Sequence, residues 1–264
     1  MFNFDKIGKI ISEQSDIIWA GIFSTLILSI FGTFVGLILG IFLAYGKRMK
    51  INDYDKAYVK VFKKIITYFC SFYSLFFRGT PMMVQALIFK YSFQAMGVNF
   101  ENIRFIPAIS NVFNGWLIAG LIVITINTAA YMCEIVISGF NGVDIGQIEG
   151  AKALGFNSKQ TSTIVVLPQA IRNAIPTIGN ELIVNIKDSS VLNVIAVSEL
   201  YYRMHDIATT NYAFLESYLL LAIIYFILTI IASIVLKLIE KKLSGVKISL
   251  NPFGRLLRRR RENV

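Results

Sequence analysis

Residues 19–45 form an apolar run without a single charged side chain, and a second charge-free run covers residues 218–236. A helix needs about 20 consecutive apolar residues to cross the hydrocarbon core of a bilayer. Only helices and closed barrels satisfy their backbone hydrogen bonds in lipid, and runs this apolar are typical of helices. Hydrophobic residues make up 55% of the 264-residue chain and charged residues only 16%, which excludes an ordinary soluble domain. The sequence therefore predicts an all-α integral membrane protein.

The positive charge of the chain lies beside its apolar runs. The formal net charge is +10, and lysines and arginines gather at residues 47–64 and 237–261. Basic segments that flank membrane spans face the cytoplasm, whereas no recognisable nucleic-acid-binding module accompanies this charge. Cys70, Cys133 and the single His205 show no metal-ligand spacing. We therefore expect contact with membrane lipid, and neither nucleic acid nor a bound metal.

Five membrane spans are predicted, the fourth of them irregular, at about residues 18–45, 80–97, 115–138, 170–197 and 216–237. An odd number of spans places the two termini on opposite sides of the membrane. Both basic segments face the cytoplasm if residues 1–17 are extracytoplasmic and residues 241–264 form a basic cytoplasmic tail. The weakly charged segments 97–113 and 199–215 then lie outside.

Two further patterns concern the helices near the N-terminus. Gly32, Gly36 and Gly40 recur every four residues, a spacing that permits close contact between helices in lipid. In residues 51–77, lysines alternate with aromatic and β-branched residues at helical spacing. That pattern predicts an amphipathic helix lying at the cytoplasmic interface.

Residues 143–168 form a polar, glycine-punctuated loop between apolar runs. Asp144 and Asn157 are each followed three residues later by glutamine, so each can cap a short helix. Gly155 would end the first helix in the left-handed conformation, and Pro168 would start the next element. Apolar side chains in such a loop indicate a docking surface for a partner: Ile145, Ile148, Leu154 and Phe156.

Polar side chains within the predicted spans are costly and normally face the bundle interior or an aqueous cavity. Two sets of them each share one helix face: Asn127, Tyr131 and Glu134, and Glu181, Asn185 and Asp188. Arg78 stands at the foot of the second predicted span. A ligand pathway and a hydrogen-bond network between helices both account for these positions, and Arg78 could also be an interface anchor.

Four stretches, in this order, resemble the polar amino-acid branch of the ABC importer permeases: FRGTP at 77–81, NTAAYMCEI at 127–135, EGAKALG at 149–155 and KDSS at 187–190. The resemblance covers roughly residues 20–240. The third stretch is similar to the EAA loop of that family, which here occupies residues 143–168. Gly150 replaces the first alanine of the family motif, and Ser189 replaces a commoner threonine.

This resemblance implies a type I ABC importer transmembrane domain over residues 18–240, in a bacterial cytoplasmic membrane. Two such subunits, identical or different, would form the transport pathway. Two copies of a cytoplasmic ABC ATPase would dock on their EAA loops, and an extracytoplasmic amino-acid-binding protein would deliver the substrate. The residues that the resemblance implies in ATPase coupling are Glu149, Ala151, Gly155 and Pro168.

The sequence contains no Walker A glycine loop, so ATP and magnesium are expected in the partner ATPase. We therefore expect a non-catalytic permease subunit with no cofactor of its own. It would work by alternating access, driven by the different affinity of ATP for the two states of the complex.

A zwitterionic amino acid needs an anionic group for its ammonium and a cationic or amide donor for its carboxylate. The residues expected to line a pathway for a polar amino acid offer both: Arg78, Thr80, Gln85, Asn127, Tyr131, Glu134, Lys187, Asp188 and Ser189. Two other functions stay open. An ion-coupled secondary transporter could use the intramembrane charges as ion carriers, and a structural subunit could use the EAA loop as a scaffold contact.

Overall fold

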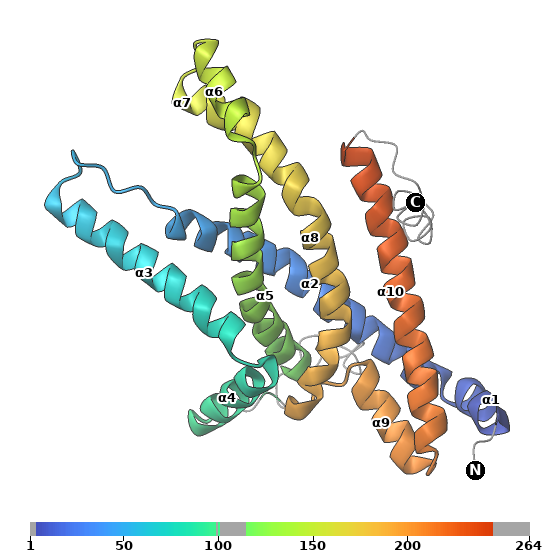
Figure 1. The fold of residues 1–264 in the computed structure, drawn as a ribbon. Coiled ribbons are helices and arrows are strands. Elements are labelled where there is room, and N and C mark those ends of the chain that lie inside the picture. The colour runs from blue at the N-terminus through green and yellow to red at the C-terminus, as the bar shows by residue number, and fades with distance from the viewer. Residues whose placement is uncertain (1–3, 99, 101–114, 245–264) are drawn as a thin grey trace, which may run out of the picture.

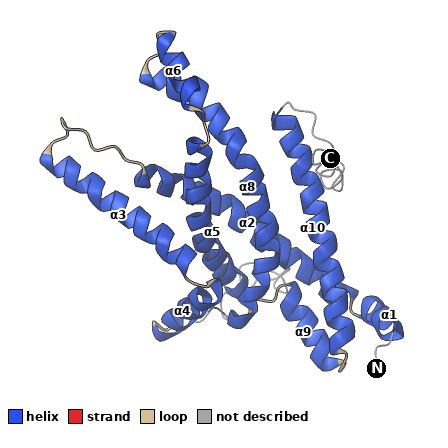
Figure 2. Cartoon of the chain, in the orientation of Figure 1, coloured by secondary structure: helices blue, strands red, loops and turns tan. Residues whose placement is uncertain are grey.

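The computed structural model describes residues 4–98, 100 and 115–244, and throughout these residues every regular element is a helix (Figures 1 and 2). The all-α prediction is confirmed for this part of the chain. The elements are α1 (Phe4–Glu13), α2 (Ser15–Lys47), α3 (Ala57–Gly79), α4 (Met82–Ala95), α5 (Gly115–Asn141), α6 (Ile145–Ala153), α7 (Ser158–Gln160), the π-helix η3 (Thr161–Val166), α8 (Leu167–Asp188), the 3-10 helix η4 (Ser189–Ile195), α9 (Leu200–Thr210) and α10 (Phe214–Ser244).

Among the long helices, α2 crosses α5, α8 and α10 obliquely and the start of α3 diverges from them, while the short helices lie at the two ends of the bundle (Figure 1). α6 and α7 stand at one end, toward which the start of α3 and the last turns of α10 also point. α1, α4 and α9 lie at the opposite end. Most of the expected outer connection 97–113 and the tail beyond residue 244 lie outside the described residues.

Three of the described helices, α2, α5 and α10, are long and apolar enough to cross a membrane, judged by length and composition. They fall on the predicted spans 18–45, 115–138 and 216–237. The predicted span 80–97 contains α4, whose 14 residues make a helix of about 21 Å. The hydrocarbon core is about 30 Å thick, so α4 alone is too short to be the span expected there.

A break between α3 and α4 accounts for this difference. Thr80 has an extended backbone, with φ −119° and ψ 143°, and the helical region is disfavoured for a residue that precedes a proline such as Pro81. α3 itself runs for 23 residues, about 35 Å. Its second half packs on α2 and α5, where Cys70 and Ser74 are buried. The helix predicted to lie along the interface over 51–77 is therefore part of the bundle.

The three glycines of α2 face α5 across a very short distance. A Cβ added at each glycine would come within 2.5–2.9 Å of an α5 side chain, closer than real Cβ atoms approach other groups. The pairs are spaced by four residues on both helices: Gly32 with Ile124, Gly36 with Thr128 and Gly40 with Met132. The predicted role of this glycine spacing in close packing is confirmed, and it sets how tightly α2 lies against α5.

Gly40→Ala is expected to lower the melting temperature of the protein in detergent. The added Cβ would lie 2.5 Å from Met132 Cβ and 2.9 Å from the Cys133 backbone nitrogen, and backbone cannot move aside as a flexible side chain does. Overpacking of this kind costs about 1–3 kcal/mol. The matched control is Gly8→Ala in α1, because among the described residues no atom lies within 4 Å of its added Cβ. Equal melting temperatures for the two variants would contradict the close contact.

At the end of the bundle opposite the EAA loop, the carboxylate of Glu199 links three helices. Its side chain is 0% exposed and caps α9 by accepting hydrogen bonds from the Tyr201 and Tyr202 backbone N–H groups, both at 2.8 Å. The Tyr225 hydroxyl of α10 donates to it at 3.1 Å, and the next residue, Leu200, donates its N–H to Thr25 of α2. Burial raises the pKa of Glu199 to about 7, against the opposing effect of these donors.

The stability of the protein in detergent is expected to fall as the pH rises from about 5 to about 7. The folded-state pKa of Glu199, about 7, exceeds the ordinary value of 4.5, so between these values the folded state binds a proton that the unfolded state has lost. Raising the pH therefore removes stability over this window, on the order of 3 kcal/mol in total. Glu199→Gln cannot ionise and should flatten the curve of melting temperature against pH. A variant curve as steep as that of the wild type would count against this assignment.

Candidate functional site

A cavity of about 520 Å³ lies where the α3–α4 break, α5 and α8 meet. The side chains on its walls are of mixed charge and polarity, unlike the apolar surroundings expected of a packed helix bundle. The lining residues are Arg78, Gly79, Thr80, Pro81, Met82, Asn127, Tyr131, Glu181, Val184 and Asp188. Five of the nine predicted pathway residues therefore meet at one place: Arg78, Thr80, Asn127, Tyr131 and Asp188.

The wall formed by the α3–α4 break is fixed by hydrogen bonds from two amide side chains. Gln85 donates to the backbone carbonyls of Phe77 and Thr80, both at 2.9 Å. Asn127 of α5 donates to Gln85 Oε1 at 3.0 Å, which ties the break to α5. Gln85 is buried, and its amide is directed toward the α3–α4 break. It therefore lies behind the cavity wall, where it holds Thr80 and Pro81 in position.

Charges of opposite sign stand on different walls of the cavity. Arg78 comes from the end of α3, with its guanidinium carbon 5.7 Å from the centre of the Tyr131 ring. Glu181 and Asp188 come from α8, where they lie two helical turns apart and line the same cavity. A small molecule with separate positive and negative groups would find a partner for each. Glu181 was not among the predicted pathway residues, although its spacing from Asp188 placed both on one face.

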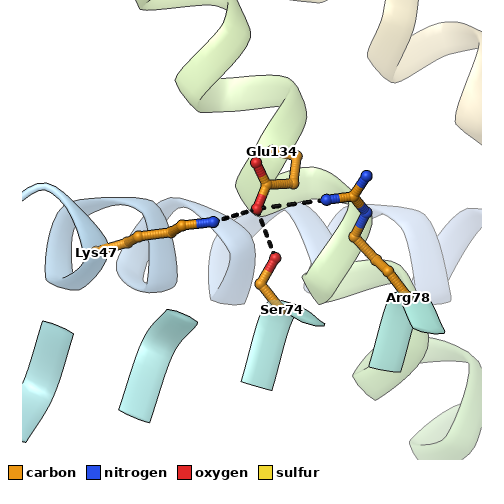
Figure 3. Close-up of polar contacts among 4 residues, drawn as sticks. All are labelled: Lys47, Ser74, Arg78 and Glu134. Atoms are coloured by element: carbon orange, nitrogen blue, oxygen red, sulfur yellow. Dashed lines mark hydrogen bonds and ion pairs between the residues drawn. The ribbon is translucent and has the colours of Figure 1, made fainter. Parts of the chain in front are cut away.

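Glu134 occupies a polar cluster where α2, α3 and α5 meet (Figure 3). Its Oε1 accepts hydrogen bonds from Lys47 Nζ at 2.5 Å and from Ser74 Oγ at 2.6 Å. Arg78 Nη1 lies 3.4 Å from the same oxygen. Glu134 is not among the described residues that line the cavity. It lies beside the cavity, where its carboxylate neutralises Lys47 and positions Arg78.

The remaining predicted pathway residues of α8 and η4 are placed apart from the cavity lining. Ser189 is buried and its Oγ donates to the Ile186 carbonyl at 3.0 Å. Lys187 is exposed and does not occur among the described lining residues. Asn185, which shares the helix face of Glu181, is buried and donates to Thr33 Oγ1 at 2.8 Å. In this part of α8, the carboxylates of Glu181 and Asp188 therefore line the cavity, whereas the amide of Asn185 holds α8 to α2.

The EAA loop begins with the helix caps expected from its sequence. Asp144 Oδ1 accepts from the Gly146 N–H at 2.7 Å, so it caps α6, although without the reciprocal bond predicted from Gln147. Asn157 and Gln160 form a complete capping box at the start of α7, with both bonds at 2.9 Å. These caps fix the direction of two short helices that few tertiary contacts restrain.

Gly155 ends α6 in the left-handed conformation, with φ +85°. Its N–H donates to the Lys152 carbonyl at 2.9 Å, and the Phe156 N–H donates to the Ala151 carbonyl at 3.1 Å. This pair of bonds is the Schellman arrangement. Glu149 is exposed, Ala151 is buried, and Leu154 at 80% exposure projects an apolar side chain outward.

Between α7 and α8 the chain forms a π-helix, η3, so residues 158–188 follow one nearly continuous helical path. The expectation that Pro168 marks the start of the next element is confirmed: Pro168 lies in the first turn of α8, directly after η3. A proline within a helical path lacks an N–H and removes one hydrogen bond. A π-turn widens the helix locally, which accommodates the missing donor.

Three comparisons with known proteins agree on the relatives of this chain. The family model described as "Binding-protein-dependent transport system inner membrane component" matches residues 36–245. The arginine transport system permease protein ArtQ of Bacillus subtilis is 31% identical over 233 residues, which cover 88% of this chain and 94% of ArtQ.

Solved structures give the same result. The crystal structure of an amino acid ABC transporter with histidines is similar, with a TM-score of 0.76 and 30% identity over 92% of this chain and 99% of that one. The inward-facing MetNI methionine ABC transporter has a TM-score of 0.58 at 16% identity, covering 92% of this chain and 99% of its own. At that identity the second likeness concerns the fold alone.

Proposed function

Since the chain belongs to the family of binding-protein-dependent transport system inner membrane components, we propose that it is the permease subunit of an ATP-driven importer of a polar amino acid. The observation that carries this proposal is the cavity between α3, α5 and α8, which holds Arg78 on one wall and two carboxylates on another. The amino acids that the names of its relatives give, arginine for ArtQ and histidines for the solved amino acid ABC transporter, belong to this class.

In the proposed complex Arg78 binds the substrate carboxylate through two parallel N–H bonds, the geometry that a guanidinium fork favours. Asp188 and Glu181 bind the ammonium group, and a cationic side chain where the substrate has one. Tyr131 lies beside Arg78 and packs on the rest of the substrate. Glu134 acts indirectly, by holding Arg78 next to the cavity.

The EAA loop is the proposed contact with the ATPase. Exposed Ile145, Glu149 and Leu154 stand on α6 and its cap, which suits a docking surface of apolar side chains with one charge. Each complex would hold two copies of the ATPase, a second permease subunit, identical or different, and an extracytoplasmic amino-acid-binding protein. ATP and magnesium would be bound by the ATPase. A displacement of α6 and α7 would be transmitted to the cavity by α8.

The proposed topology places the N-terminus outside and the EAA loop and the C-terminus in the cytoplasm of a bacterial cell. A cysteine replacing Tyr212, which is 83% exposed between α9 and α10, is expected to react with an impermeant thiol reagent in intact cells. A cysteine at Ser158 should react only after the cells are opened. Both belong in a background without Cys70 and Cys133, which are buried. Labelling of position 158 from outside would overturn the orientation.

Reconstitution tests the function as a whole. The chain, its ATPase and its binding protein in proteoliposomes should take up a polar amino acid only when ATP is supplied, with uptake unaffected by ionophores. An ion-coupled secondary transporter would lose uptake when the gradient is dissipated, whatever the ATP supply. A structural subunit would be dispensable, so uptake by complexes that lack this chain would also contradict the proposal.

A further inference from the structure

An apolar groove of about 540 Å³ lies between α2, α5, α8 and α10, apart from the charged cavity. Its walls are aliphatic except for Thr33 of α2 and one aromatic ring, Phe140, at the end of α5. Ile41 of α2 and Ile171 of α8 line it and are 48% and 50% exposed. The groove therefore opens sideways between α8 and three helices that are long and apolar enough to cross a membrane, α2, α5 and α10, so we expect lipid to surround it.

The groove and the charged cavity use different faces of α8. Ile171, Ile178 and Leu182 face the groove, whereas Glu181, Val184 and Asp188 face the cavity. At about 100° per residue, the centres of these two sets are roughly a quarter turn apart. A second permease subunit that completes the charged cavity would sit on the Glu181 face and leave the groove to the lipid.

The cytoplasmic mouth of the groove carries positive charge. Arg48, directly after α2, is exposed and places its guanidinium carbon 5.4 Å from the centre of the Phe140 ring. Its Nη1 lies 3.3 Å from Asn141 Oδ1, so the guanidinium has a fixed position over the groove wall. The last turns of α10 contribute Leu236 and Ile239 to the groove, and Lys242 follows Ile239 at about 60° around the helix.

We propose that this groove binds one acyl chain of an anionic phospholipid of the cytoplasmic leaflet, with the lipid phosphate held by Arg48. An apolar groove that opens to the bilayer takes up hydrocarbon, and basic residues at its mouth meet the headgroup layer. Arginine binds phosphate oxygens in pairs, and anionic lipids are attracted to basic residues beside a span. This lipid site does not depend on which substrate is transported. It requires only that the C-terminal end of α10 faces the cytoplasm.

Native mass spectrometry of the delipidated permease–ATPase complex tests this site, with phosphatidylglycerol and phosphatidylcholine added separately. The wild-type complex should retain phosphatidylglycerol in preference to phosphatidylcholine. Arg48→Gln should reduce that preference by about fivefold, the factor expected for one basic residue near an anionic surface. Lys64→Gln on exposed α3 is the matched charge control and should change nothing.

Filling the groove should abolish retention of both lipids. Ile171→Trp places a large side chain in the groove, and Ile223→Trp, at a 52% exposed position of α10, is the matched control. If Ile171→Trp fails to assemble, Ile41→Trp fills the same groove from α2. Lipid retention unchanged in Arg48→Gln and in the filled variant would overturn the proposal. A disulfide between two copies that carry Ile171→Cys would also overturn it, because a second subunit would then occupy the groove.

Discussion

Gly155→Val is expected to abolish co-purification of the ATPase with the permease and to reduce ATP-driven uptake at least about tenfold. The backbone at position 155 has φ +85°, where a side chain with Cβ is strained by about 1–2 kcal/mol and a β-branched one by more. The chain would relieve this strain by leaving the left-handed conformation. That change breaks the two backbone bonds that end α6 and misplaces α7 relative to α6.

The measurement is recovery of the ATPase on an affinity-tagged permease, together with uptake in proteoliposomes. Gly150→Ala is the matched control, because no described atom lies within 4 Å of its added Cβ and its helix tolerates alanine. It should keep both assembly and uptake. Normal assembly and transport in Gly155→Val would mean that the EAA loop is not the contact that couples ATP to this subunit.

Arg78→Gln is expected to reduce uptake at limiting substrate by about 10–100-fold, the effect of losing a hydrogen-bonded charge. ATPase binding should stay normal, because Arg78 lies in the last turn of α3, and this end of α3 points away from α6 and α7 (Figure 1). The Arg78 side chain is 43% exposed and lines the cavity, so its shortening leaves no buried hole. Uptake at saturating substrate should recover in part, since the other cavity residues remain.

Glu134→Gln is expected to show the reverse pattern, with a lower melting temperature in detergent and a smaller loss of uptake. The carboxylate is the partner of Lys47 and Arg78, and its neutralisation leaves two positive charges close together without compensation. The loss of uptake should follow from the poorer placement of Arg78. If the variant were as stable as the wild type and yet failed to bind substrate, Glu134 would itself be a ligand for the ammonium group.

The features predicted correctly from the sequence depend on residues close together in the chain. The apolar run 19–45 is long enough to define α2 without tertiary information, and the caps at Asp144 and Asn157 rest on groups within three residues of each other. The left-handed conformation of Gly155 follows from the same local chemistry. The glycine spacing of α2 also predicted close packing correctly, because residues four apart lie on one face of a helix, whichever helix packs against that face.

The features that the sequence left undetermined depend on distant residues. Glu134 and Lys47 are 87 positions apart, and no spacing rule distinguishes a carboxylate in a cluster from one that lines a cavity. Asn185 and Glu181 share a face of α8, yet Thr33 of α2 holds the amide while Glu181 lines the cavity. The amphipathic pattern of α3 fitted both a helix along the interface and a helix packed on α5.

The path from Ser158 to Asp188 has a mechanical consequence. Thirty or so helical residues extend for about 45 Å, and the segment joins the proposed ATPase contact directly to the charged cavity. When this segment moves as one rigid body, a tilt of about 5° at one end displaces the other end by about 4 Å over that length. That displacement exceeds the reach of a hydrogen bond, which is about 3 Å. In the proposed complex, a rotation of a few degrees at the EAA loop would therefore be enough to carry Asp188 away from a substrate ammonium group whose carboxylate stays on Arg78.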